Sequence, residues 1–176
     1  VENDRVIGGI DELSTQKAIL FYSKYVKGEL HGTNARTAEM CKLVENSSRD
    51  VQIAFANELS LICDKADINI WELINLANKH PRVNILKPGI GVGGHCIPID
   101  PYFLIEKYKN RDSIIKVARK INDKKIKYVS KKLLKIIRDL NLTKPILFLG
   151  LSYKENVGDF RESPAIKVIS DFSTKY

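Results

Sequence analysis

A glycine-rich segment that contains a cysteine is the densest group of chemistry-bearing residues in this sequence. It reads Gly-Ile-Gly-Val-Gly-Gly-His-Cys-Ile-Pro-Ile-Asp-Pro over residues 89–101, and its glycines allow the backbone to approach a ligand closely. Cys96 stands just before an expected helix, where the helix dipole and free N–H groups favour a thiolate. We therefore predict that Cys96 is a nucleophile toward an aldehyde, with Asp100 placed to accept a proton or orient a water.

Two other interpretations of this segment compete with that one. It contains a literal Gly-x-Gly-x-x-Gly pattern, which indicates a dinucleotide site when it follows a strand and opens a helix. No apolar strand precedes it here, and Pro98 and Pro101 disturb the start of the next helix, so we reject that interpretation. A free cysteine is also often only a small buried hydrophobe. This alternative stays open for Cys96 and is the expected one for Cys41 and Cys63, which fall in a predicted helix.

A polar stripe follows one side of the long helix predicted over residues 35–64. Four side chains fall within about 80° of arc at about 100° per residue, opposite an apolar side. Such a stripe is often a solvated face, but asparagines are poor helix formers, so binding and solvation both remain open. The four residues are Lys42, Asn46, Arg49 and Asn57.

A third candidate is the polar segment 150–164, which follows an apolar run that reads as a buried strand over residues 145–150. Open α/β sheets bind ligands at the carboxyl ends of their strands, so Lys154 and Arg161 could meet a diphosphate there. An ordinary charged loop is an equally good interpretation, with Ser163 as the helix N-cap and Pro164 in the first turn.

The elements that must position these residues are mostly helical. Apolar residues recur at three- and four-residue steps along most of the chain, and residues 82–101 lack that periodicity and form an irregular loop. The helix over 112–140 is expected to connect two domains. The predicted elements are a strand at Arg5–Gly9, helices over 14–25, 35–64, 71–79 and 112–140, a helix restarting near Pro101, the strand over 145–150 and a helix from about Ser163.

Composition narrows the classes of function. The net charge of +8 suits a phosphate-bearing ligand or nucleic acid. The lysines between Lys116 and Lys135 match no known nucleic-acid-binding motif and are predicted to form the solvated face of a helix, so we expect no nucleic-acid partner. Three cysteines without a Cys-x-x-Cys spacing indicate neither a disulfide framework nor a metal site. No apolar run approaches a membrane span and the first residues do not resemble a signal peptide, so we expect a cytoplasmic protein with no membrane partner.

Together, three segments resemble the UDP-glucose/GDP-mannose dehydrogenase family, and the resemblance covers essentially the whole chain. Residues 37–46, Thr-Ala-Glu-Met-Cys-Lys-Leu-Val-Glu-Asn, resemble the opening of the family's central helical domain. The segment around Cys96 resembles its nucleophile loop, and residues 154–164 resemble the entry to its nucleotide-sugar domain.

The resemblance implies an NAD-dependent, two-step oxidation of a sugar C6 alcohol. The alcohol loses a hydride to give an aldehyde, Cys96 adds to it as a thiohemiacetal, a second hydride transfer leaves a thioester, and water releases the uronate. Lys42 and Asn46 match residues that position the reacting oxygen, and Asp100 matches a proton-handling aspartate. The positions that match substrate contacts are Asn57, Gly93, Lys154, Asp159 and Arg161, of which Arg161 is also a candidate for cofactor binding.

Departures from the family pattern point to a branch within it. Where many glucose-specific members have Ser before the cysteine and Lys before the aspartate, this chain has His95 and Ile99. That version is similar to the branch acting on UDP-N-acetylhexosamines, notably UDP-N-acetylmannosamine; UDP-glucose remains the alternative, as does a helical dimerisation module without the chemistry. The NAD fingerprint and most of the nucleotide-sugar domain are absent, so we expect the chain to be inactive by itself.

The resemblance also implies a domain order and a partner. We expect a mostly α chain with a helical central dimerisation domain and a long connecting helix, followed by the first βα unit of a Rossmann-like α/β domain. A UDP-sugar and a second copy, bound through the central helices, are the expected partners. The implied boundaries are 1–10 for the last strand of an NAD-binding domain, 11–111 for the central domain, 112–141 for the connecting helix and 142–176 for the start of the UDP-sugar domain.

Overall fold

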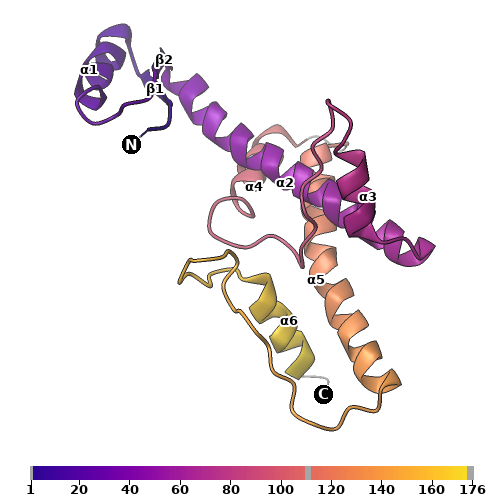
Figure 1. Cartoon of the computed structure of the whole chain (residues 1–176). Coiled ribbons are helices and arrows are strands. Elements are labelled where there is room, and N and C mark those ends of the chain that lie inside the picture. Colours follow the sequence, from indigo (N-terminus) through magenta and orange to yellow (C-terminus); the bar gives the residue numbers. More distant parts are fainter. Residues whose placement is uncertain (1, 110–111, 174–176) are drawn as a thin grey trace. The chain divides into compact units, whose positions relative to one another are not determined.

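A computed structural model of the chain describes residues 2–109 and 112–173, and it confirms the mostly helical fold class (Figure 1). The chain divides into two compact units, one up to Glu45 and one from Asn46 onward. The 32-residue helix α2, Ala35–Ala66, begins in the first unit and continues in the second. In the described residues, no helix is both long enough and apolar enough to span a membrane.

The first unit is a strand–helix–strand arrangement. Strand β1, Arg5–Gly9, pairs in parallel with β2, Leu30–Asn34, so that Gly9 lies opposite Asn34. Helix α1, Glu12–Tyr22, makes the crossover that parallel strands require, and the Asp11 side chain caps it by accepting the Ser14 backbone N–H at 2.6 Å. β1 was predicted, whereas β2 was not. Because α1 and β2 pack with β1, this compact unit extends to Glu45.

The second unit is built from helices. After α2 come α3, Ile70–Ala77, and α4, Asp100–Tyr108, and then the 26-residue α5, Ile114–Asp139, and α6, Pro164–Ser173. Helices α4 and α6 both contact α5. The buried apolar side chains of this unit come mainly from α2, α5 and α6: Ala54, Ala56, Cys63, Ala118, Ile126, Ile137, Val168 and Phe172. All the helices expected for this part of the chain are present, within a few residues of their predicted ends.

The strand predicted over residues 145–150 is the one expected element that the described chain does not form. This stretch connects α5 to α6 as irregular backbone (Figure 1), and Leu147 and Leu149 are 80% and 86% exposed. A strand is held by hydrogen bonds to neighbouring strands, and the described residues place no strand beside it. The predicted boundary after residue 111 falls on residues outside the described part, as do residues 1 and 174–176 of the outer predicted domains.

Candidate functional site

Cys96 lies directly before the N-terminus of α4. Its carbonyl oxygen accepts hydrogen bonds from the backbone N–H groups of Ile99 at 3.0 Å and Asp100 at 2.8 Å, which begin the helical turn. Ile99, the N-cap of α4, makes no side-chain cap, and Pro101 occupies the first turn. The thiol is free and partly accessible. Cys96 precedes Asp100, the first residue of α4, by four residues.

Asp100 and Asn46 are brought together across 54 residues of sequence. The Asn46 amide nitrogen donates a hydrogen bond to the Asp100 carboxylate at 2.5 Å, and Asn46 is buried. Both residues were predicted for the site from separate motifs. The contact fixes the Asp100 carboxylate at the start of α4, four residues after Cys96, where it can exchange a proton with a reacting group or a water.

Lys42 lies on α2 in the first unit. Its ammonium forms an ion pair with Glu45 at 3.6 Å, and both side chains are mostly exposed. Its predicted role beside the reacting oxygen stays a prediction.

The glycines before Cys96 are required by packing within the second unit. A side chain at Gly93 would place its Cβ 2.6 Å from the Tyr153 Cβ and 2.7 Å from the Pro164 Cδ, and one at Gly91 would meet Ile126 at 2.7 Å. Gly94 has a φ of 90°, which L-residues rarely adopt, and faces the Tyr153 ring. The space that a dinucleotide would need against these glycines is filled by protein, which agrees with rejecting the Gly-x-Gly-x-x-Gly pattern as a cofactor loop.

The segment between α5 and α6 contacts the cysteine segment directly. The Gly94 N–H donates to the Arg161 carbonyl oxygen at 3.2 Å, and the His95 imidazole lies 3.9 Å from the Asp159 carboxylate. Lys154 is exposed. Ser163, expected to cap α6 with its side chain, instead donates its hydroxyl to the Leu151 carbonyl oxygen at 2.6 Å, which closes this loop on itself.

Asp159 and Arg161 form an ion pair within that loop. Arg161 donates to Asp159 from Nε at 3.0 Å and from Nη2 at 2.7 Å, and these hydrogen bonds lower the pKa of Asp159 to about 2. The same pairing raises the pKa of Arg161, with smaller contributions from Tyr153 and Cys96. The guanidinium is 68% exposed, so it presents a charged edge to solvent close to the cysteine segment.

Asn57, expected on the substrate side, is fully buried and its amide is shared between two protein partners. Its Nδ2 donates to the Asn122 Oδ1 at 2.9 Å, and its Oδ1 accepts the Gly89 N–H at 2.9 Å. The stripe predicted on α2 is thus divided, because Asn46 and Asn57 face the protein interior whereas Lys42 and Arg49 are exposed.

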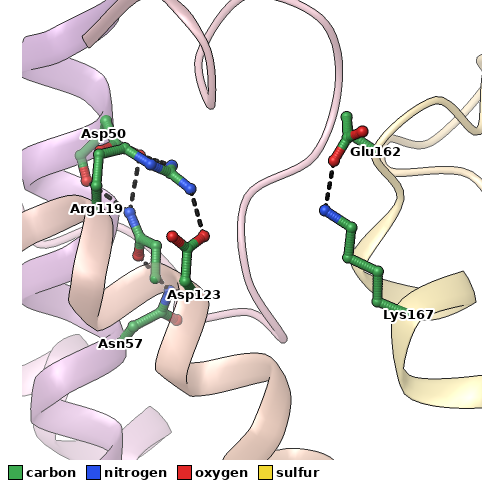
Figure 2. A network of polar contacts seen from close by, with 7 residues as sticks. Asp50, Asn57, Arg119, Asp123, Glu162 and Lys167 are labelled. Atoms are coloured by element: carbon green, nitrogen blue, oxygen red, sulfur yellow. Dashed lines mark hydrogen bonds and ion pairs between the residues drawn. The ribbon is translucent and has the colours of Figure 1, made fainter. Parts of the chain in front are cut away.

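Sequence reasoning missed the buried polar network that continues from Asn57 (Figure 2). Arg119 on α5 donates to Asp50 on α2 at 2.6 Å and to Asp123 at 2.6 Å, and Asn122 donates to Asp50 at 2.8 Å. The available signal was the position of Arg119 and Asn122 beside Ala118 and Ile126 on the apolar side of α5, where solvated residues are not expected.

Lys125 is a second departure from the predicted wet face of α5. Its side chain is buried, with the ammonium donating to the Ser60 hydroxyl at 2.5 Å and lying 5.4 Å from the centre of the Tyr128 ring. Burial lowers the pKa of this lysine. The prediction that all the lysines of this helix are solvated is therefore wrong at this position, because a hydroxyl and an aromatic face replace water.

Comparison with known proteins gives one consistent result. The central domain of the UDP-glucose/GDP-mannose dehydrogenase family matches residues 36–124. UDP-N-acetyl-D-mannosamine dehydrogenase of Campylobacter jejuni is 56% identical over 169 residues, and NDP-N-acetyl-D-galactosaminuronic acid dehydrogenase of Ralstonia solanacearum is 51% identical over 170; both alignments cover 96% of this chain.

Among solved structures, UDP-D-ManNAc dehydrogenase of Pyrococcus horikoshii is 43% identical, with a TM-score of 0.90 over 99% of this chain and 42% of that one. The chain covers 41% of the Campylobacter jejuni protein and 40% of the Ralstonia solanacearum protein. It therefore spans about two fifths of the length of these relatives.

Proposed function

This chain belongs to the UDP-glucose/GDP-mannose dehydrogenase family, and from that premise we propose that it is part of an NAD-dependent UDP-N-acetylmannosamine 6-dehydrogenase. The observation that carries the proposal is the placement of Cys96 at the N-terminus of α4, four residues before an Asp100 held by Asn46. An accessible thiol, a helix dipole and a fixed carboxylate suit nucleophilic addition to an aldehyde. The names of the relatives support an N-acetylated sugar, and UDP-glucose or another UDP-N-acetylhexosamine is the alternative substrate.

The residues of this chain supply the sulfur and proton chemistry of the reaction. The Cys96 thiolate adds to the C6 aldehyde, which loss of a hydride from the alcohol to NAD would leave, and forms a thiohemiacetal. Loss of a second hydride to NAD would turn this adduct into a thioester, and water cleaves the thioester to release the carboxylate and the free thiol. Asp100 is placed to take a proton from the alcohol or from the attacking water. In the proposal, Lys42 and Asn46 hold the reacting oxygen and stabilise negative charge that develops on it.

NAD is the hydride acceptor that the resemblance implies, but the glycine-rich segment before Cys96 does not fit a dinucleotide. The glycine-rich segment is filled by Tyr153, Pro164 and Ile126, and of the residues proposed here only Arg161 is a candidate contact. When bound, NAD would accept the two hydrides that the two oxidations release.

The nucleotide part of the substrate fits the segment between α5 and α6. Lys154 is exposed and Arg161 is mostly exposed, and a guanidinium can hold a diphosphate through two hydrogen bonds. Contact of this segment with the cysteine segment through Gly94, His95 and Arg161 places it beside the nucleophile. Gly93 lies at the same contact, where a backbone without side chain allows close approach.

A homodimer through the central helices is part of the proposal. Helix α2 exposes the apolar side chains of Val44, Phe55 and Ile62, which are 49%, 52% and 54% exposed. Apolar side chains in this number along one helix are suited to burial against a second copy.

The test uses the full-length polypeptide that carries this chain. NADH formed per UDP-N-acetylmannosamine consumed would be measured for the unaltered protein, for Cys96→Ala and for Cys41→Ala as a matched cysteine control, with UDP-N-acetylglucosamine and UDP-glucose in parallel. We expect two NADH per sugar, abolished by Cys96→Ala and unchanged by Cys41→Ala. Activity retained by Cys96→Ser would favour a chain that keeps the family's fold without its thiol chemistry.

A further inference from the structure

Gly89, the first residue of the cysteine segment (residues 89–101), is hydrogen-bonded to the fully buried side chain of Asn57. The Gly89 N–H donates to the Asn57 Oδ1, and the Asn57 Nδ2 donates to the Asn122 Oδ1, both at 2.9 Å. Asn57 and Asn122 are each 0% exposed. Since both ends of the Asn57 amide are used, rotating it by half a turn would set its NH₂ against the Gly89 N–H. The Asn57 amide can therefore accept the Gly89 N–H in only one of its two orientations.

Asn122 is itself held by charged groups. Its Nδ2 donates to the Asp50 carboxylate at 2.8 Å and to the Asp50 carbonyl oxygen at 3.1 Å, and Arg119 donates to the same carboxylate oxygen at 2.6 Å. Hydrogen bonds to ionised groups are shorter and stronger than those between neutral groups. A chain of contacts thus runs from Arg119 through Asp50, Asn122 and Asn57 to Gly89, and links α2 and α5 to the cysteine segment. Figure 2 shows the part of this chain between Arg119, Asp50 and Asn57.

We propose that Asn57 and Asn122 are positioning residues that clamp the start of the cysteine segment, so that Cys96 and Asp100 keep a fixed relation to α2. This role differs from the substrate contact that the resemblance implies for Asn57, because its two polar atoms already have protein partners. The consequence for catalysis depends on the proposed function, whereas the clamp itself is a property of this chain. Asn122 touches the segment only through Asn57, so the two residues act in series.

The experiment measures hydrogen–deuterium exchange by mass spectrometry and alkylation of Cys96 by iodoacetamide, both resolved by peptide, in the full-length polypeptide. The variants are Asn57→Ala, Asn122→Ala and the conservative Asn57→Asp, which keeps an oxygen that can accept the Gly89 N–H. Asp123→Asn is the matched control, since it alters the solvent-facing edge of the network and leaves the contacts to Gly89 in place.

In Asn57→Ala and Asn122→Ala we expect exchange in peptides covering residues 87–97 to rise by about tenfold or more, as for a local opening. Peptides from α2 and α5 should keep their protection, and the alkylation rate of Cys96 should change. Asn57→Asp keeps the acceptor for Gly89 but loses the donor to Asn122, so it should raise the exchange as Asn122→Ala does. A substrate contact would instead raise KM with the exchange unchanged. Unchanged exchange in these peptides, or an equal rise across α2, α5 and the segment, would overturn the proposal.

The result separates this inference from the proposed function. If Cys96→Ala is inactive and Asn57→Ala leaves the exchange unchanged, only the clamp is wrong. If the exchange rises as expected while Cys96→Ala keeps its activity, the clamp stands and the thiol chemistry is wrong.

Discussion

Two aspartate–arginine pairs occupy opposite environments in the second unit. Asp50 and Arg119 lie between α2 and α5, where their side chains are 0% and 4% exposed. Asp159 and Arg161 lie in the loop before α6, with Arg161 largely in solvent. The shortest contacts are nearly equal, at 2.6 Å and 2.7 Å. Nearly equal distances therefore coexist with very different exposure to solvent.

The direction of the aspartate pKa shows the same difference. Burial raises the pKa of Asp50 although Arg119 and Asn122 oppose it, whereas the hydrogen bonds from Arg161 lower the pKa of Asp159 to about 2. In the buried pair the loss of water is the larger effect. Removing one partner there leaves a charge without solvent, but removing one partner in the loop lets water replace it.

Replacement of Arg119 by Leu should have the largest effect on stability. It leaves the Asp50 carboxylate buried without its counter-charge, and we expect a loss of about 3–5 kcal/mol in the free energy of unfolding, measured by urea denaturation. The matched control is the double variant Asp50→Leu with Arg119→Leu, which removes both charges and should recover much of the loss. If the double variant were as unstable as the single one, packing of the arginine stem and not its charge would explain the effect.

Replacement of Arg161 by Ala should separate binding from stability. Because the guanidinium is mostly solvated, we expect no measurable change in the urea midpoint, but a roughly tenfold weaker affinity of the full-length polypeptide for its UDP-sugar from the loss of a bidentate phosphate contact. Calorimetric titration measures the affinity. Lys167→Ala is the control, since it breaks the neighbouring Glu162–Lys167 ion pair (Figure 2) and should leave the affinity unchanged. Equal losses in both variants would indicate a general charge effect.

The smallest expected effect is the change in stability when the Asp159 carboxylate, paired with Arg161, is protonated in acid. The folded-state pKa of Asp159, about 2, lies below its ordinary value of 3.8. The stability that the ion pair contributes is therefore fully present above pH 3.8 and is lost as the pH falls toward 2. Carbon-detected NMR of the carboxyl group should show this low pKa. In Arg161→Ala the pKa should return toward 3.8, and an unchanged value would mean that another group holds the carboxylate.

Local patterns predicted most of the fold. The apolar periodicity of α2 and α5 and the proline near the start of α4 placed these helices close to their observed ends. Strand β2 escaped prediction because Leu-His-Gly-Thr-Asn has no clear alternation of apolar residues, and it is formed by pairing with β1. The strand expected over residues 145–150 had the right composition, but composition alone does not supply a pairing partner.

The site was predicted where a motif is local and missed where it depends on distant contacts. Cys96 and Asp100 share one short segment, and Asn46 was found from its helix face. Asn122 and Asp50 are separated by 72 residues, so neither one indicates the other in the sequence. Asn57 was selected from the sequence as a substrate contact, which stays a prediction; the structure adds that its amide oxygen accepts the Gly89 N–H.

The wide sequence separation of the network has a consequence for how the chain is made. Asp50 and Asn57 leave the ribosome 69 and 65 residues before their partners Arg119 and Asn122, which is several seconds at about 5–20 residues per second. During that interval their polar groups must remain hydrated. The cysteine segment, synthesised in between, can take its final conformation only after α5 has emerged. In the nascent chain, the segment that carries Cys96 is therefore expected to lack its hydrogen bond to Asn57 in a fixed orientation until α2 and α5 meet.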